Sequence, residues 1–261
     1  MDLDLTGKTA LVTGSTAGIG RATALALARQ GATVVVNGRS QERVDAAMAA
    51  IRAAVPEARL QGVAADGTTA DGVAKVFAAV PEVDVLVNNL GGVSTMKPFQ
   101  ELDDADWQRS WDRNVVSAVR FTRHYLPSMR ARDWGRVVFV ASESGVQIPV
   151  EFVDYGVAKA AVIALARGVA EGLIHSGVTV NAVLPGPTLA EGFTRRLKES
   201  GQTEEELAKT FFTERRPTSL IKRFASVEEV ASMIVYLCTP AASATHGAAL
   251  RVDGGVIKSA F

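Results

Sequence analysis

The sequence predicts an α/β fold, a doubly wound parallel sheet of seven strands with helices on both faces. Short runs rich in β-branched residues alternate with longer segments of helical periodicity along most of the chain. The short runs are almost continuously apolar, as expected of strands that are buried on both faces of a parallel sheet. The first run leads through a glycine-rich turn directly into a helical pattern. This order of elements is typical of doubly wound folds.

The expected strands and helices alternate in chain order. The strands are expected at residues 9–13, 33–37, 60–65, 83–88, 137–141, 178–184 and 248–252, and the helices at 19–30, 41–55, 69–80, 106–132, 154–175 and 226–238. In the first helical pattern Ile19, Ala22 and Leu25 share one face, and Gly31 suits the position just after a helix end. Pro127 falls inside the fourth helical pattern, and we expect it to kink or end that helix.

One segment, residues 185–224, interrupts the alternation. It is mixed in charge and contains Phe193, Phe211 and Phe212. Long irregular insertions in compact domains are usually functional or mobile. No linker rich in Pro, Ser or Gly divides the remaining chain. We therefore expect residues 1–261 to form a single domain with a lid-like insertion that faces the substrate.

Composition excludes several classes of protein. The 261 residues contain 28 Lys and Arg against 28 Asp and Glu, and this balance argues against a sequence-independent nucleic-acid binder. The one cysteine, Cys238, cannot form an intramolecular disulfide, and it is typical of a reducing, cytoplasmic compartment. The sequence contains no long apolar run that would span a membrane. Asp103, Asp104 and Asp106 precede a helical pattern, where the helix dipole favours acids, so we do not expect a metal site there.

The glycine-rich turn reads Thr-Gly-Ser-Thr-Ala-Gly-Ile-Gly from Thr13 to Gly20. Glycines permit a tight turn and close approach of a ligand, and the N-terminus of the following helix offers free N–H groups to a pyrophosphate. The alternative is an ordinary turn between a strand and a helix, but the strand before it and the helix after it favour a dinucleotide site of the Rossmann type. The residues expected to contact the dinucleotide here are Gly14, Ser15, Thr16, Gly18, Ile19 and Gly20.

The end of the second expected strand indicates which nicotinamide cofactor is used. An acid there would bind the hydroxyls of the adenine ribose, whereas an arginine would accept a 2′-phosphate. The sequence has Asn37, Gly38, Arg39 and Ser40 and no acid. A 2′-phosphate would find a cation and a hydroxyl there. The alternative is a solvated arginine in a turn, and NADP(H) is favoured over NAD(H).

A second constellation, Ser142, Tyr155 and Lys159, suits carbonyl chemistry. Tyr155 and Lys159 are four residues apart on a predicted helix and face the same way. Ser142 follows the strand expected at 137–141, at the edge where doubly wound sheets bind ligands. A tyrosine hydroxyl can give a proton to a forming alkoxide, a lysine ammonium favours the phenolate, and a serine can hold the carbonyl oxygen. The alternative is a packed tyrosine beside a solvated lysine.

Taken together, these motifs resemble the short-chain dehydrogenase/reductase family. The resemblance runs from Lys8 to about Val256 and rests on several ordered motifs. They are the glycine turn, Asn88-Asn89-Leu90-Gly91, Asn114, Ser142, Tyr155, Lys159, Pro185-Gly186 and Val252-Asp253-Gly254-Gly255. The resemblance implies an oxidoreductase that uses a nicotinamide cofactor and acts on a carbonyl or secondary alcohol, since the three residues between Tyr155 and Lys159 favour this chemistry over C=C reduction. Together with the end of the second expected strand, this predicts an NADP(H)-dependent enzyme. It also implies a homotetramer, with a homodimer as the alternative.

The resemblance assigns a role to each matching residue. Tyr155 would be the acid/base, Lys159 would also hold the nicotinamide ribose, Ser142 would orient the carbonyl, and Asn114 would support a proton relay with Lys159. Further cofactor contacts would come from Asp66, Asn88, Asn89, Gly91, Pro185, Gly186 and Thr188. Two residues depart from the family pattern, Leu90 in place of an alanine and Ala190 in place of a threonine. We expect Leu90 to reshape the loop beside the nicotinamide, and Thr188 to replace the missing contact.

Two alternative functions remain open from the sequence. One is a more specific enzyme, a 3-oxoacyl-thioester reductase. The other is a non-catalytic regulator that binds the cofactor, although Asn114, Ser142, Tyr155 and Lys159 are all present and argue against it. The expected substrate pocket is largely apolar, because the loop after Val146 and the phenylalanines of residues 185–224 would line it.

Overall fold

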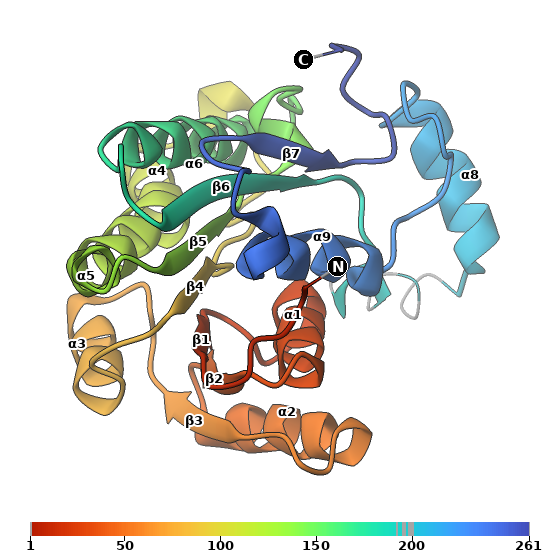
Figure 1. The fold of residues 1–261 in the computed structure, drawn as a ribbon. Coiled ribbons are helices and arrows are strands. Elements are labelled where there is room, and N and C mark those ends of the chain that lie inside the picture. The colour runs from red at the N-terminus through yellow and green to blue at the C-terminus, as the bar shows by residue number, and fades with distance from the viewer. Residues whose placement is uncertain (1, 192, 195–196, 198–200, 261) are drawn as a thin grey trace.

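The computed structural model describes residues 2–191, 193–194, 197 and 201–260. Within these ranges seven strands form one parallel sheet in the order β3-β2-β1-β4-β5-β6-β7 (Figure 1). The strands are β1 (Thr9–Val12), β2 (Thr33–Gly38), β3 (Leu60–Ala64), β4 (Val85–Asn88), β5 (Gly135–Val140), β6 (Val178–Pro185) and β7 (Ala249–Val252). The chain order reverses between β1 and β4, which is the topology of a doubly wound sheet. The predicted fold class is confirmed.

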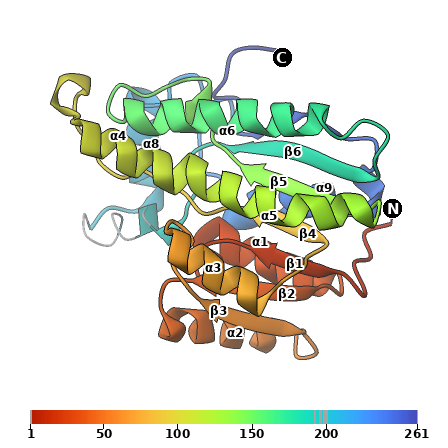
Figure 2. The ribbon, with the colours of Figure 1, turned by 90° about the vertical axis from the view of Figure 1, so that its left-hand side faces the viewer.

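Helices cover both faces of the sheet. Helices α3 (Ala70–Ala79), α5 (Ser117–Ala131) and α6 (Val153–Glu171) cover one face, and α1 (Gly18–Arg29), α2 (Gln41–Ala54) and α9 (Val227–Cys238) cover the other (Figures 1 and 2). Neighbouring residues of one strand enter different cores, since Leu11 packs on the α5 side and Val12 on the α1 side. Both faces are therefore apolar, which explains the continuous apolar runs of the sequence. Cys238 is fully buried in the α1 side core.

The fourth helical pattern differs from the prediction. It is divided into α4 (Asp104–Trp111), a π-helical segment (Asp112–Val116) and α5. Helix α5 continues through Pro127 to Ala131, so the helix does not end at the proline. Proline removes a single N–H bond, and the buried side chains of Phe121 and Tyr125 hold the helix on the sheet across that gap. At the start of α4, Asp103 and Asp106 form a capping box, as the helix-start interpretation of these acids expects.

Part of the expected insertion is helical. Helix α8 (Glu204–Glu214) lies beyond the carboxyl ends of the strands, at one side of the molecule (Figure 1). Phe211 packs against Phe193, Phe212 and Phe224, with ring centroids 5.2–5.5 Å apart. Residues 192, 195–196 and 198–200 of this insertion lie outside the described residues. None of the helices in the described ranges is both long and apolar enough to cross a membrane.

Candidate active site

The glycine turn follows β1 and opens α1. Gly14 and Gly18 have φ values of +63° and +52°, in the left-handed region that favours glycine. A Cβ on Gly20 would lie 2.5 Å from Nδ2 of Asn89 and 2.6 Å from the carbonyl oxygen of Gly14. Ala17, the N-cap residue of α1, offers no side-chain cap to the N–H groups of the first turn. These groups are therefore available to an anion such as a pyrophosphate.

Two adjoining cavities meet at this turn. One of about 1010 Å³ lies over the ends of β1 and β2, and one of about 850 Å³ lies over the ends of β5 and β6. Both are lined by Gly14, Ala17, Asn89, Gly91 and Ser94. They form a continuous groove along the carboxyl edge of the sheet. We refer to them below as the first and the second cavity.

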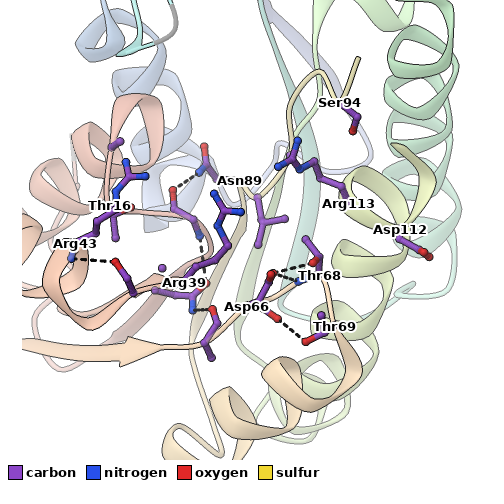
Figure 3. A pocket seen from close by; sticks show the side chains of 18 of the residues that line it. Thr16, Arg39, Arg43, Asp66, Thr68, Thr69, Asn89, Ser94, Asp112 and Arg113 are labelled. Atoms are coloured by element: carbon purple, nitrogen blue, oxygen red, sulfur yellow. Dashed lines mark hydrogen bonds between the residues drawn. The ribbon is translucent and has the colours of Figure 1, made fainter. Parts of the chain in front are cut away.

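The first cavity is rich in arginine (Figure 3). Arg39 reaches it from the end of β2, Arg43 from the first turn of α2, and Arg113 from the π-helical segment across the cavity. Arg43 forms an ion pair of 3.1 Å with Glu191, and both side chains are more than half exposed. Ser40 is the N-cap of α2, and its hydroxyl accepts a hydrogen bond of 3.4 Å from the N–H of Arg43. The charges and the helix start favour an anion here.

Asp66 also lines the first cavity. Partial burial by itself would raise the pKa of this carboxyl, but hydrogen bonds from Thr68 and the nearby charges of Arg39 and Arg113 outweigh it, so the pKa lies below its ordinary value. Oδ1 accepts bonds from the N–H and the hydroxyl of Thr68 at 3.0 and 2.7 Å. Asp66 is therefore an ionised acceptor facing the cavity at neutral pH.

Three of the residues expected to contact the cofactor have side chains turned to the protein interior. The Ser15 hydroxyl accepts a bond from the N–H of Asn37. Asn37 is fully buried and uses its amide to hold Gly14, Val63 and Ala65. Asn88 is buried and donates to Thr122. These side chains shape the turn and the strand ends, and Asn37 also lines the first cavity.

Asn89 links the two cavities to the glycine turn. Its Nδ2 donates to the carbonyl oxygens of Thr13 and Gly14 at 2.9 and 3.1 Å. The turn is therefore held from the end of β4. The remaining residues expected at the cofactor lie along the groove. Thr16, Arg39, Ser40 and Asp66 line the first cavity, Gly18, Ile19, Gly20, Pro185, Gly186 and Thr188 line the second, and Gly14 and Gly91 line both.

Ser142, Tyr155 and Lys159 line the second cavity together. The first turns of α6 present Tyr155 and Lys159 on one face, and Nζ of Lys159 lies 5.7 Å from the centre of the Tyr155 ring. Nζ also donates a bond of 2.8 Å to the carbonyl oxygen of Val140, at the end of β5. Burial raises the pKa of Tyr155 to about 12 and lowers the pKa of Lys159 to about 8.

Asn114 sits behind these residues on the π-helical segment. Its Oδ1 accepts a bond of 2.9 Å from the N–H of Gly92, and its Nδ2 donates to the carbonyl oxygens of Gly92 and Ser110. Gly91 separates Asn114 from Lys159, because a Cβ on Gly91 would lie 2.8 Å from Oδ1 of Asn114 and 3.0 Å from Nζ of Lys159. The polar groups of Asn114 and Lys159 therefore face one small space that exists because residue 91 is glycine.

The two departures from the family pattern are both accommodated. The Leu90 side chain is turned toward Gly67, where a Cβ would lie 2.9 Å from its Cδ1. The extra volume of leucine therefore occupies the place of a side chain that residue 67 lacks. Ala190 lines the second cavity, as does Thr188, whose hydroxyl donates to the carbonyl oxygen of Gly186 at 2.9 Å.

Several polar side chains that line these cavities were not among the predicted site residues. Four of the charged ones are Arg43, Arg113, Glu143 and Arg216. Glu143 directly follows Ser142 in the sequence, so the prediction of Ser142 as a site residue could have pointed to Glu143 as well. Arg113 adjoins Asn114 in the same way. Arg43 and Arg216 carry no such signal, because their places depend on the start of α2 and on the segment that follows α8.

Comparisons with known proteins agree with this arrangement. The family model of short chain dehydrogenases matches residues 8–201. An uncharacterized oxidoreductase of Bacillus subtilis, YvaG, is 42% identical over the full length of both chains. A D-beta-hydroxybutyrate dehydrogenase of Cupriavidus necator is 33% identical, with 96% of this chain and 98% of the relative covered.

A solved structure shares both the fold and the arrangement of elements. The L-sorbose reductase of Gluconobacter frateurii, solved with NADPH and L-sorbose, superposes with a TM-score of 0.90 at 34% identity, and the match covers 99% of this chain and 100% of that chain. The sheet order, the full-length relatives and the family match lead to one conclusion. The chain is an oxidoreductase that belongs to the short-chain dehydrogenase/reductase family.

Proposed function

We propose that the protein transfers hydride between NADP(H) and a carbonyl or secondary-alcohol substrate. The observation that carries the proposal is the second cavity, which is lined both by Ser142, Tyr155 and Lys159 and by the glycine turn. The groove can hold an extended dinucleotide, with its pyrophosphate at the N-terminus of α1. The bound nicotinamide supplies or accepts the hydride. The protein then has to hold the carbonyl and move one proton.

Tyr155, Ser142, Lys159 and Asn114 each have a distinct task in this proposal. Tyr155 donates the proton to the carbonyl oxygen in reduction. At neutral pH its phenol is protonated, since the ordinary pKa of tyrosine is near 10 and burial raises that of Tyr155 to about 12, so the donating form is available without a further step. Ser142 holds the carbonyl oxygen, and Lys159 binds the nicotinamide ribose. Asn114 connects Lys159 to a proton relay.

The ionisation of Tyr155 should make the rates of alcohol oxidation and carbonyl reduction depend on pH in opposite directions. Alcohol oxidation needs the phenolate, so its rate should rise as the pH increases toward the pKa of Tyr155. Carbonyl reduction needs the phenol and should lose rate in the same range.

The preference for NADP(H) rests on the first cavity. Arg39, Arg43 and the start of α2 surround the place where a 2′-phosphate would lie, and the end of β2 offers no acid for the ribose hydroxyls. The L-sorbose reductase of similar structure was solved with NADPH. We therefore propose that Arg39 is the main cation that binds this phosphate. Arg43 would leave its ion pair with Glu191 and bind the phosphate as a second cation.

Replacing Arg39 tests this cofactor preference. We expect Arg39→Ala to weaken NADPH binding by roughly 10- to 100-fold, because a charge-assisted hydrogen bond contributes about 1.5–3 kcal/mol. NADH binding should change far less. The measurement is the dissociation constant of each cofactor by fluorescence titration. Arg52→Ala, on the exposed face near the end of the same helix α2, is the control. Equal losses for the two cofactors in Arg39→Ala would show that the preference is wrong.

A screen of carbonyl compounds tests the reaction itself. The panel should contain 3-oxoacyl thioesters, steroid-like ketones, ketosugars and polyketide-like ketones, each with NADPH and with NADH. We expect substrate-dependent loss of the reduced-nicotinamide absorbance with at least one class. The second cavity is lined by Phe152, Phe193 and Phe211 but also by Glu143 and Arg216, so both apolar and polyhydroxylated ketones belong in the panel. Tight NADPH binding without any turnover across the panel would favour a cofactor-binding regulator.

Three further expectations remain proposals. They are the single-domain organisation, the homotetramer and the cytoplasmic location. The first is supported by the continuous sheet, which uses strands from residue 9 to residue 252.

A further inference from the structure

Glu143 is a buried carboxylate directly beside Ser142. It belongs to a short 3-10 turn (Glu143–Gly145) after β5 and is 3% exposed. Its Oε2 accepts a bond of 2.9 Å from the Ser142 hydroxyl and a second one from the Ser144 hydroxyl. Its Oε1 accepts a bond of 2.8 Å from Nε of Arg216. A charge removed from water to this extent needs such partners, since an unpaired buried carboxylate is strongly destabilising.

Arg216 reaches this carboxylate from a distant part of the chain. It follows α8, 73 residues after Glu143, and is 8% exposed. Its backbone N–H donates to the carbonyl oxygen of Phe211, and Nη1 donates to that of Arg215. The ion pair therefore attaches the segment behind α8 to the turn that carries Ser142. Glu143 and Arg216 both line the second cavity with Tyr155.

The bonds around Ser142 determine where its single proton points. The hydroxyl oxygen accepts the N–H of Ser144 at 3.1 Å and donates its proton to Glu143. A serine hydroxyl has one proton, so this proton is directed away from Tyr155 while the bond to Glu143 lasts. Glu143 therefore competes with a substrate carbonyl for the Ser142 proton. Arg216 weakens that competition, because its guanidinium binds the other oxygen of the Glu143 carboxylate and makes the carboxylate a weaker acceptor for the Ser142 proton.

We propose that Glu143 and Arg216 form a positioning pair for the proton-transfer residues, in which Glu143 orients the Ser142 hydroxyl and places a negative charge beside the Tyr155 phenol, while Arg216 limits the strength of both effects. The inference rests on the proposed function, since it assigns the proton to Tyr155. It extends that function by adding a carboxylate and a guanidinium that act through Ser142 and through charge.

The groups around Tyr155 influence its pKa through burial, hydrogen bonding and charge. After burial, the influences on its pKa are the neighbouring Ser142 hydroxyl, whose hydrogen bonding lowers it, and the negative charge of Glu143, which raises it. Other charged groups also face this region. They are Lys159 on α6, the exposed pair Arg215–Glu151 at 3.0 Å, Glu191 on the cavity wall and the buried Asp154 next to Tyr155. Only Glu143 and Arg216 are joined to Ser142 by the bonds described above.

The two members of the pair should shift the ionisation of Tyr155 in opposite directions. Glu143→Gln keeps the shape and removes the negative charge, so Tyr155 should ionise at a pH lower by about one unit. Arg216→Met keeps the length and leaves Glu143 without its counter-charge, so Tyr155 should ionise at a higher pH. Arg216→Lys retains the charge and should stay near the wild type. A merely structural role would lower activity in each variant without these opposite shifts.

Two measurements determine the pH at which Tyr155 ionises in each variant. The first is the pH profile of kcat for alcohol oxidation in each variant. The second needs no turnover and is the tyrosinate absorbance of the NADP⁺ complex, taken as the difference from the same variant with Tyr155→Phe, over the pH range in which circular dichroism remains native. Arg223→Met is the matched control, because Arg223 forms an exposed ion pair of 2.7 Å with Glu229 in the same segment and does not line the second cavity. This control should leave both readouts unchanged.

The outcomes separate the inference from the proposed function. If Arg216→Met does not fold, the double variant Glu143→Gln/Arg216→Met removes both charges, and its profile should lie between those of Glu143→Gln and the wild type, because Glu143→Gln alone leaves the Arg216 charge unpaired. Shifts of the same sign in Glu143→Gln and Arg216→Met, or no shift in Glu143→Gln, would overturn the inference. Absence of turnover in the wild-type protein would instead contradict the proposed function, and the absorbance titration would still decide the role of the pair.

Discussion

Tyr155→Phe should lower kcat for carbonyl reduction by about 10²- to 10⁴-fold, because the substitution removes the proposed proton donor. This loss corresponds to about 3–5 kcal/mol of transition-state stabilisation. The ring remains, so its contact with Phe152, with centroids 5.8 Å apart, and the cavity wall should be retained. NADPH binding should therefore be almost unchanged. Steady-state kinetics and a fluorescence titration of NADPH measure the two effects separately.

Tyr236→Phe provides the matched control for this experiment. Tyr236 lies on α9, outside both cavities, and loses the same hydroxyl in the substitution. Its kinetics should equal those of the wild type. Activity in Tyr155→Phe comparable to that of Tyr236→Phe would show that another group supplies the proton.

Gly91→Ala should reduce kcat by about 100-fold, because it fills the space between Asn114 and Lys159. The new Cβ would lie 2.8 Å from Oδ1 of Asn114 and 3.0 Å from Nζ of Lys159, so at least one of these groups must move. A displacement of about 1 Å in a catalytic site can cost 10²-fold in rate. The φ of Gly91 lies outside the left-handed region, so alanine adopts the backbone without strain and the effect is steric. Kinetics and thermal unfolding of the variant should show a rate defect with little loss of stability.

Gly168→Ala gives the corresponding control. Gly168 is exposed on α6, the helix of Tyr155 and Lys159, and a Cβ there would meet no atom within 4 Å. Alanine at this position should raise the stability by about 0.5–1 kcal/mol through helix propensity and leave the rate unchanged. If Gly91→Ala retains full activity, the space between Asn114 and Lys159 has no part in the reaction.

The sequence predicted the sheet well because each strand is a local signal. Apolar β-branched runs such as the one at Val34–Val36 need no knowledge of their partners, and the boundaries of the seven strands agree within two residues. Tyr155 and Lys159 could be placed side by side for the same reason, since helical spacing is local. The position of the irregular turn in the fourth helix could not be predicted, because Pro127 is a strong local signal and the π-helical segment at Asp112–Val116 has none.

Contacts between segments that are distant along the chain could not be predicted from the sequence. The amide of Asn37, a residue predicted to contact the cofactor, bonds to Gly14, Val63 and Ala65, which lie 23, 26 and 28 residues away along the chain. The Glu143–Arg216 pair depends on how the segment behind α8 folds back over the sheet, and no spacing rule encodes that path. The accommodation of Leu90 likewise depends on Gly67, which is a neighbour only in the folded chain.

The most direct test of the central claim is isotope transfer. NADPH deuterated at C4 of the nicotinamide, on each face in separate reactions, is incubated with the protein and a ketone that the screen identifies, and the alcohol product is analysed by mass spectrometry. Hydride transfer predicts one deuterium on the carbinol carbon with one of the two labelled cofactors and none with the other, and almost no product in Tyr155→Phe. Alcohol that contains no deuterium with either cofactor, or a protein that binds NADPH and yields no alcohol, would contradict the account.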